Sequence, residues 1–157
     1  MPGATDTWTS EPIFWPPGTV TEPDDADSVI PAGGVAGGQT IAVSGSGKTL
    51  GLIGAGDYGA PSGTATVTYT DGTTQSATIG FSDWTLGGGG GSLAFGNTLV
   101  VSTPYRNMTS GGNQQIGTDL FAIAPIALTA GKTVQSVALP ASTSGGGMIH
   151  VFALGVG

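Results

Sequence analysis

Residues 64–81 read TATVTYTDGTTQSATIGF, and this stretch decides the fold class. Thr64–Thr70 alternates small polar residues with β-prone ones, and Thr74–Phe81 resumes the alternation after Asp71-Gly72. A DG dipeptide between two alternating runs is a strong hairpin signal, because a type I′ turn needs a positive φ at both central positions. The sequence therefore predicts an antiparallel β-hairpin closed by a type I′ turn.

The rest of the chain repeats this pattern of short strands between turns rich in glycine and proline. Further strands are expected at residues 39–44, 49–54, 97–103, 132–139 and 148–154. Residues 115–128 form a long apolar run that Pro125 interrupts, so we expect one bent strand or a strand with a bulge.

A single domain over residues 1–157 follows from this pattern: an all-β, antiparallel, jelly-roll-like β-sandwich of about eight to ten strands. Residues 1–38 are expected to be an irregular N-terminal segment, and residues 39–157 are expected to hold the core strands.

The composition excludes several classes of function. The 30 glycines follow no Gly-X-Y period, which excludes collagen. The net charge is −7 and there are three cationic residues, so nucleic acids and anionic membranes are poor partners. Cysteine is absent, which excludes disulfides, thiolate chemistry and Cys-based zinc sites.

The sequence allows two interpretations of the cellular location of the protein. No apolar run has the length of a membrane span, and Met1-Pro2-Gly3 leads into a polar stretch rather than a signal peptide. The chain is therefore either cytosolic or the mature part of a secreted protein behind a new methionine. The surface, rich in Thr, Gly and Ser and poor in Lys, favours a secreted, extracellular protein.

Two segments resemble nucleotide-binding motifs. Residues 54–59 read GAGDYG and match GxGxxG, and Ser46–Thr49 reads SGKT like the end of a P-loop. Both motifs need a following helix whose N-terminus binds phosphate, and both are followed here by an expected strand. We interpret residues 54–59 as a chance match in a glycine-rich region and residues 46–49 as a tight hairpin with an exposed Lys48.

Catalysis has little support in the sequence. His150 is the only histidine, it lies in an expected apolar strand, and no GxSxG elbow frames a serine. Asp57, Asp83 and Asp119 could supply the two carboxylates of a glycosidase, but no spacing favours a pair. We therefore expect no enzyme, with a small hydrolase as an open alternative.

An acidic segment, Glu22–Asp27, raises the question of a metal. Calcium prefers several oxygen ligands from one such loop, and Asp24, Asp25 and Asp27 could provide them. No EF-hand pattern is present, and a solvated loop is the simpler reading. No other cofactor is expected.

Several aromatic residues have polar or glycine-rich neighbours and could stack on sugar rings. For Trp84 and Trp15, burial in the core is the competing explanation, and Arg106 could instead form a buried ion pair with Asp83. The candidate carbohydrate-binding residues are Trp84, Tyr105, Arg106, Asn107, Tyr58 and Asp57.

The middle of the chain also resembles a known family. The run VTYTDGTTQSATIGFSDWTLGGG at residues 67–89, FGN at 95–97 and PYRN at 104–107 resemble an accessory module appended to secreted actinobacterial glycoside hydrolases. The likeness extends over nearly the whole chain, through AGGQTIAVSGS at 36–46, AGKTVQSVAL at 130–139 and IHVFALG at 149–155.

This resemblance implies a non-catalytic β-sandwich that binds carbohydrate, with a polysaccharide and the catalytic domain of a parent glycosidase as partners. The chain departs from the family by lacking an upstream segment rich in Gly, Asp, Tyr and Ser, and by diverging most in its first forty residues. A missing strand would leave a sheet edge unpaired, open to residues 1–15 or to another chain. The alternative function is therefore an extracellular structural or adhesive subunit that assembles through that edge.

Overall fold

Strands dominate the computed structural model, which describes residues 36–107 and 112–157. One four-residue helical turn, α1 (Leu86–Gly89), interrupts them, and all four of its residues have a positive φ, outside the range of a right-handed helix. The strands are β1 (Thr40–Gly45), β2 (Thr49–Gly56), β3 (Ser62–Tyr69), β4 (Thr74–Gly80), β5 (Thr98–Thr103), β6 (Arg106–Asn107), β7 (Asn113–Gln114), β8 (Thr118–Ala122), β9 (Ile126–Ala127), β10 (Val134–Ala138) and β11 (Ile149–Val156).

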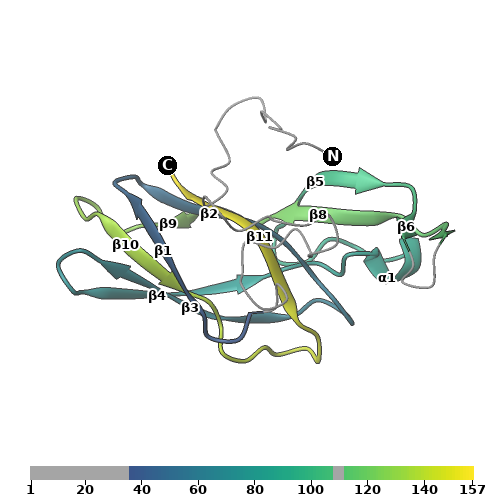
Figure 1. The fold of residues 1–157 in the computed structure, drawn as a ribbon, viewed down its shortest axis with the longest axis horizontal. Helices are drawn as coiled ribbons and strands as arrows, with labels where there is room; N and C mark the ends of the chain where they lie inside the picture. Colours follow the sequence, from purple (N-terminus) through teal and green to yellow (C-terminus); the bar gives the residue numbers. More distant parts are fainter. Residues whose placement is uncertain (1–35, 108–111) are drawn as a thin grey trace.

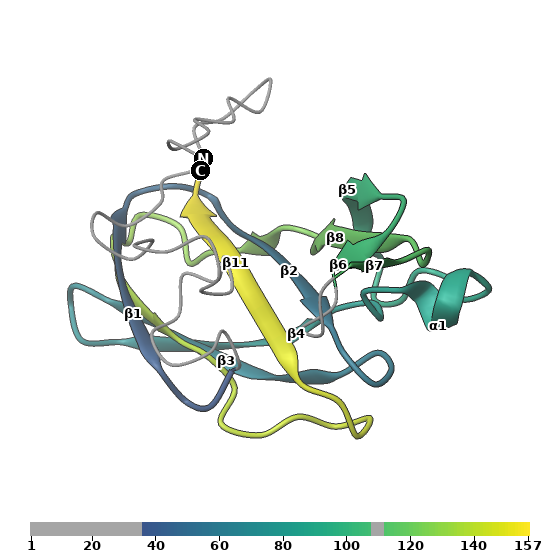
Figure 2. The same ribbon diagram turned by 45° about the vertical axis from the view of Figure 1, so that its right-hand side comes forward.

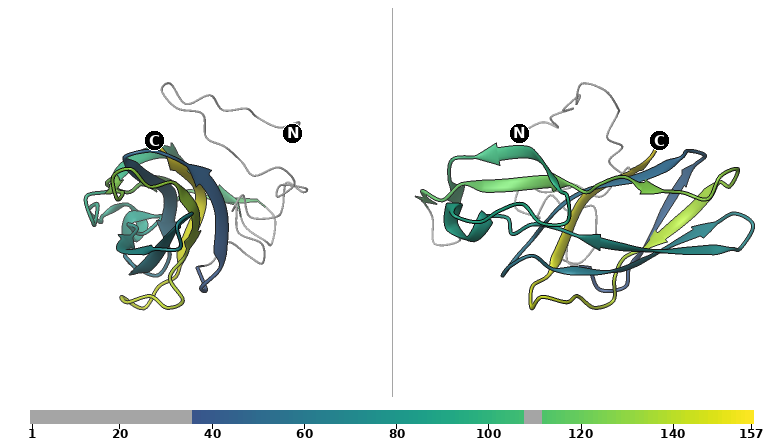
Figure 3. Two further views of the ribbon diagram at one scale, coloured as in Figure 1. Left: turned by 90° about the vertical axis from the view of Figure 1, so that its left-hand side faces the viewer. Right: turned by 180° about the vertical axis from the view of Figure 1, so that it is seen from behind.

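The strands form two main sheets that face each other (Figures 1 and 3). One sheet has the order β1-β10-β3-β4, and the other has the order β11-β2-β8-β5 with β9 also paired to β2. A separate ribbon, β6-β7, lies beside α1 at one end of the molecule (Figure 2). All strand pairs are antiparallel, so the predicted all-β, antiparallel, sandwich-like class is confirmed.

The core lies between the two sheets and contains one side of each central strand. In β3, for example, Ala65, Val67 and Tyr69 are buried while the intervening threonines face outward. The largest fully buried side chains come from both sheets and from the segment that joins them: Tyr69, Phe81, Phe121, Leu50, Leu52, Ile79, Ile149, Val67, Val134, Val137, Val151 and Pro61. Burial of these apolar surfaces drives the two sheets together.

The predicted β3–β4 hairpin is confirmed, but its predicted turn type is wrong. The Gly72 N–H donates to the Tyr69 carbonyl and the Tyr69 N–H donates to the Thr73 carbonyl, both at 2.9 Å. Three residues therefore form the loop, and Gly72 alone among them has a positive φ, of 81°. The turn is therefore a three-residue loop with a left-handed glycine. Asp71 lacks the positive φ that a type I′ turn requires, and its Oδ1 accepts hydrogen bonds from the N–H and the hydroxyl of Thr73.

The expected hairpin at residues 46–49 is also wrong. Strands β1 and β2 belong to different sheets, and the segment between them carries the chain from one sheet to the other. The N–H groups of Lys48 and Thr49 both donate to the Gly157 carbonyl, which joins this crossing to the end of the described chain. Lys48 itself is exposed, as expected.

The long apolar run of residues 115–128 becomes two strands on one edge of β2. Strand β8 pairs with β2 at Ile53 and Gly54, and β9 pairs with β2 at Thr49 and Leu50. The interruption falls at Pro125, which has no N–H for the ladder. Within the described ranges, no helix is long and apolar enough to cross a membrane.

The three-residue turn gives a first prediction. Replacing Gly72 with alanine should lower the free energy of unfolding by about 1 kcal/mol, because an L-residue is strained at this positive φ although open space surrounds it. Chemical denaturation measures the change.

Gly155→Ala is the matched control, since Gly155 also faces open space but has no positive φ. It should leave stability unchanged or raise it slightly. Equal losses in the two variants would contradict the assigned turn conformation.

Candidate functional site

Tyr58 is the most exposed large hydrophobic side chain in the part of the chain that the structure describes, at 82%. It lies in the loop between β2 and β3 with a φ of 50°. Asp57 fixes the loop on one side, since its Oδ1 accepts from the Met148 N–H at 2.6 Å. On the other side, the Gly59 N–H donates to Asp83 Oδ2 at 2.9 Å. An exposed aromatic ring is thus presented on a loop that is fixed at both ends.

Asp83 connects this loop to the next one. Besides the Gly59 bond, its Oδ1 accepts from the Thr85 N–H at 2.9 Å, the Thr85 hydroxyl at 2.7 Å and the Gly87 N–H at 3.1 Å. Partial burial opposes ionisation of Asp83, but the hydrogen bonds from Thr85, Gly87 and Gly59 outweigh it and lower the pKa of this carboxyl. The carboxylate therefore orders two loops at once.

Arg106 contacts Trp84 rather than Asp83. The Arg106 guanidinium carbon lies 5.1 Å from the centre of the Trp84 ring, in a cation–π contact, and Arg106 Nε donates to Gln114 Oε1 at 2.7 Å. The salt bridges of the described residues include no Arg106–Asp83 pair, so the predicted ion pair is wrong. The physical reason is that backbone N–H groups and a hydroxyl already surround the Asp83 oxygens.

The six predicted carbohydrate-binding residues fall into two groups. Asp57 and Tyr58 belong to the β2–β3 loop, whereas Arg106 and Asn107 form β6, with Tyr105 just before them and 43% exposed. Trp84 joins the second group through Arg106 and is half-buried against the core. Asp83, next to Trp84 in the chain, links the groups through its bond to Gly59.

His150 forms a pair with Asp57. Its Nε2 lies 3.3 Å from Asp57 Oδ2, and both side chains are partly buried. The same aspartate also holds Met148 through its other oxygen. Asp57 therefore ties the start of β11 to the end of β2, which is a structural contact between neighbouring strands.

The FGN motif at residues 95–97 has a structural explanation that the sequence did not reveal. Asn97 is 5% exposed, its Oδ1 accepts from the Ser82 N–H at 2.7 Å, and its Nδ2 donates to the Gly80 carbonyl at 3.1 Å. The Phe95 ring lies over Gly80, where an added Cβ would be 2.7 Å from ring atoms. This motif fixes the long loop between β4 and β5 onto the end of β4.

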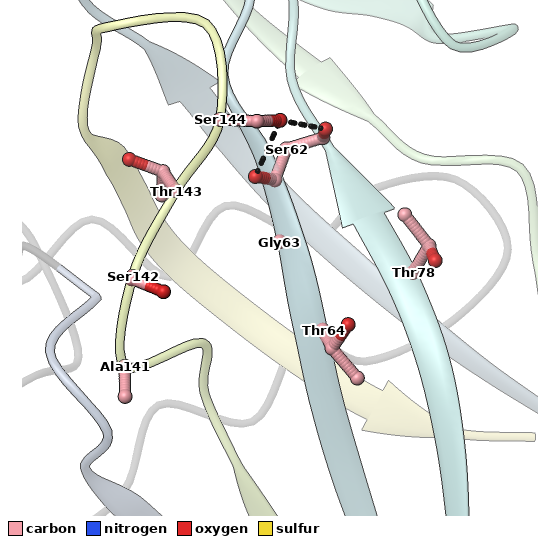
Figure 4. A pocket seen from close by; sticks show the side chains of 8 residues that line it. All are labelled: Ser62, Gly63, Thr64, Thr78, Ala141, Ser142, Thr143 and Ser144. Atoms are coloured by element: carbon pink, nitrogen blue, oxygen red, sulfur yellow. Dashed lines mark hydrogen bonds between the residues drawn. The ribbon is translucent and has the colours of Figure 1, made fainter.

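A shallow open hollow of about 560 Å³ lies between the β3–β4 pair and the loop that follows β10 (Figure 4). Its lining is almost entirely small and hydroxylated: Ser62, Gly63, Thr64, Thr78, Ala141, Ser142, Thr143 and Ser144. None of these residues was among the predicted site residues. The sequence did place Thr64 and Thr78 in strands, and their alternation with buried residues was the signal that they face outward.

The structure describes some of the residues that were predicted to bind a metal or to act in a glycosidase, but not all of them. Asp24, Asp25 and Asp27, the predicted calcium ligands, lie outside the described residues, as do Trp8 and Trp15. In residues 36–107 and 112–157, no three His, Cys, Asp or Glu side chains come together as a metal site. Asp57 and Asp83 both act as hydrogen-bond acceptors for loops.

Comparison with known proteins adds no family assignment. A scan against protein-family models finds no match, and a search of curated proteins finds no significant relative.

Asp83 gives a second prediction. Asp83→Asn should destabilise the protein by about 1–2 kcal/mol at neutral pH, because charge-assisted hydrogen bonds to two loops are weakened. The pKa of Asp83 is lowered in the folded state, so its contribution is present above the unfolded pKa of about 3.9 and is lost as the pH falls through the folded pKa.

Denaturation of both proteins between pH 7 and pH 2 checks this point. The stability difference between wild type and D83N should shrink below about pH 4. Asp119→Asn is the control, since no hydrogen bond involves its side chain within the described ranges. A difference that stays constant down to pH 2 would contradict the role of the charge.

Proposed function

We propose that this chain is a non-catalytic carbohydrate-binding accessory module of a secreted polysaccharide-active enzyme. Its partners are a polysaccharide and the catalytic domain of that enzyme, and it needs no cofactor for binding. The resemblance of residues 67–107 to such modules raised this function, and the geometry of the Tyr58 loop supports it.

The observation that carries the proposal is the fixed, exposed ring of Tyr58. A large apolar side chain that is 82% exposed gains nothing for folding, and its backbone adopts a φ of 50° that is unfavourable for a residue with a side chain. Costly backbone conformations persist where the surroundings hold them and are concentrated at ligand-binding sites. Aromatic faces stack on the apolar faces of sugars, and a fixed ring loses little entropy when it binds.

Binding without catalysis agrees with the roles of the nearby carboxylates. Asp57 and Asp83 orient the loop around Tyr58 and hold backbone N–H groups. A glycosidase instead needs one carboxyl free to donate a proton and a second free to attack or to activate water. The side chains near Tyr58 are thus suited to positioning a ring.

The test is retention on polysaccharides. Affinity gel electrophoresis of the whole chain against a panel of soluble glycans should show retardation by at least one of them, and Tyr58→Ala should weaken it about five- to tenfold. Leu99→Ala is the matched control, because Leu99 is also exposed, at 47%, but lies on β5 and not in the β2–β3 loop. Absence of retardation by every glycan would refute the proposal.

A second candidate function, self-assembly through a sheet edge, has an observation of its own. Among the described strands, β4 pairs only with β3, so it forms one edge of its sheet. Its seven residues, TQSATIG, contain no charge and no proline, the features that usually prevent edge pairing. Such an edge can accept a strand from another copy.

Size-exclusion chromatography with light scattering over a hundredfold range of concentration, about 1 to 100 μM, tests whether the chain assembles. A module that binds carbohydrate as a monomer should remain at one small size throughout. A mass that rises with concentration, and that Ser76→Lys on β4 brings back to the monomer, would favour the assembling subunit.

A further inference from the structure

The hollow beside β3 exists because the chain after β10 approaches β3 very closely. Ser144 pairs with Ser62 through backbone hydrogen bonds of 2.8 and 3.3 Å, which continues the β10–β3 pairing beyond a short excursion of the chain. Gly63 makes this possible, because a Cβ there would lie 2.6 Å from Pro140 Cβ and 2.7 Å from the Ser142 carbonyl oxygen. Residues 141–144 thus form the wall of a hollow that Thr64 and Thr78 also line (Figure 4).

The hydroxyl groups of the hollow divide into two sets. Ser62 and Ser144 bond each other at 2.9 Å, and Thr143 donates to the Gly147 carbonyl at 2.5 Å. In the described structure, the hydroxyls of Thr64, Thr78 and Ser142 have no hydrogen-bond partner in the protein. Since each hydroxyl can both donate and accept, this second set is available to a ligand.

The hydroxyls continue beyond the hollow in regular rows. Cross-strand pairs on the outer face of β3 and β4 are Thr64–Thr78, Thr66–Ser76 and Thr68–Thr74. Residues two apart along a strand are separated by about 6.8 Å, so the pairs form a short ladder of hydroxyls leading away from the hollow.

Among the described residues, those that line the hollow and form the ladder have no ionised side chain. The nearest ion pair along the hairpin is Lys132–Asp71, at the turn beyond the last threonine pair. A ligand with several negative charges would therefore find no cation here, in a chain whose net charge is −7. Neutral ligands rich in hydroxyl groups match the chemistry of this face.

The hollow also adjoins the loop of Tyr58. Gly145, which follows the hollow's wall, lies against Ala60, where an added Cβ would be 3.1 Å from the Ala60 carbonyl oxygen. Ser62, which lines the hollow, begins β3 directly after that loop. The stacking ring and the hydroxyl-lined surface therefore belong to neighbouring segments of the same end of the sheet.

We propose that the hollow is a binding subsite for an uncharged polysaccharide, whose chain continues over the hydroxyl ladder of β3 and β4. This inference rests on the proposed function and gives it a ligand class: neutral glycans, with acidic glycans excluded. Its volume of about 560 Å³ lies within the usual size of a small-molecule site. Thr64, Thr78 and Ser142 hydrogen-bond the sugar hydroxyls, and the threonine methyl groups contact the apolar faces of the rings.

The decisive variant is the double substitution Thr64→Val and Thr78→Val. Valine keeps the shape and the strand preference of threonine but removes the two free hydroxyls. The control is Thr98→Val on β5 of the other sheet, since Thr98 is also exposed. Ser142→Ala, in a loop, tests the same hollow without altering a strand, and thermal melting establishes that each variant folds.

The probes are hydroxyethyl cellulose, mixed-linkage β-glucan, arabinoxylan, galactomannan and pullulan as neutral polymers, with polygalacturonate and alginate as acidic ones. Affinity electrophoresis should show binding to a neutral polymer only. The double valine variant should weaken that binding about tenfold and Ser142→Ala by less, while Thr98→Val leaves it unchanged.

The outcomes separate this inference from the function on which it rests. In one outcome, a neutral polymer binds, Tyr58→Ala weakens this binding, and neither Ser142→Ala nor the double valine variant changes it. This result would overturn the hollow as a subsite but would support the carbohydrate-binding module. Preference for the acidic polymers would overturn the assigned ligand class alone. Failure to bind any polymer would overturn both.

Discussion

The packing of Phe81 onto Gly54 is the contact on which the arrangement of the two sheets depends. Phe81 is fully buried, and a Cβ at Gly54 would lie 2.6 Å from its ring and 2.3 Å from the His150 carbonyl oxygen. Phe81 is also the point where the chain leaves β4 in one sheet and runs beside β2 of the other, through backbone bonds between Gly56 and both Ser82 and Trp84. Because protein cores are close-packed, this crossing fixes the spacing of the sheets and, two residues after Phe81, the position of Asp83.

The glycine pattern that resembles a nucleotide-binding loop follows from this packing. Gly54 leaves space for Phe81, and Gly56 leaves space for Pro61, which would otherwise lie 2.4 Å from an added Cβ. The segment then enters β3 instead of a helix, so no N–H groups converge on a phosphate. The same close approach turns the chain sharply after β2, and the turn presents Tyr58 to solvent. A packing requirement in the core thus determines the conformation of the loop at the surface.

The sequence reveals the features of this structure that depend on local patterns, but not those that depend on long-range contacts. The strand positions were predictable, because period-two alternation is a local property and β3, β4 and β10 express it clearly. The strand that pairs with β1 was not predictable, since the choice between β2 and β10 depends on residues about ninety positions away in the sequence. The hollow was hidden for the same reason: Thr64 and Thr78 are recognisable as outward-facing, but the wall beside them comes from residues 141–144. Likewise, the charges of Arg106 and Asp83 suggested an ion pair, and only the geometry shows that Arg106 contacts Trp84 instead.

Strand β4 takes part in both candidate functions, and its geometry makes them compatible. Strand addition uses the backbone N–H and C=O groups that point sideways from the edge of the sheet, whereas the glycan would contact side chains that stand perpendicular to it. A second copy added to β4 would continue the rows of hydroxyls from Thr66 and Ser76 into the neighbouring sheet instead of covering them. Assembly would then lengthen the surface offered to one polysaccharide chain and strengthen its retention through multivalency. The uncharged edge of β4 and the uncharged outer face of β3 and β4 would then both serve contact with a neutral polymer.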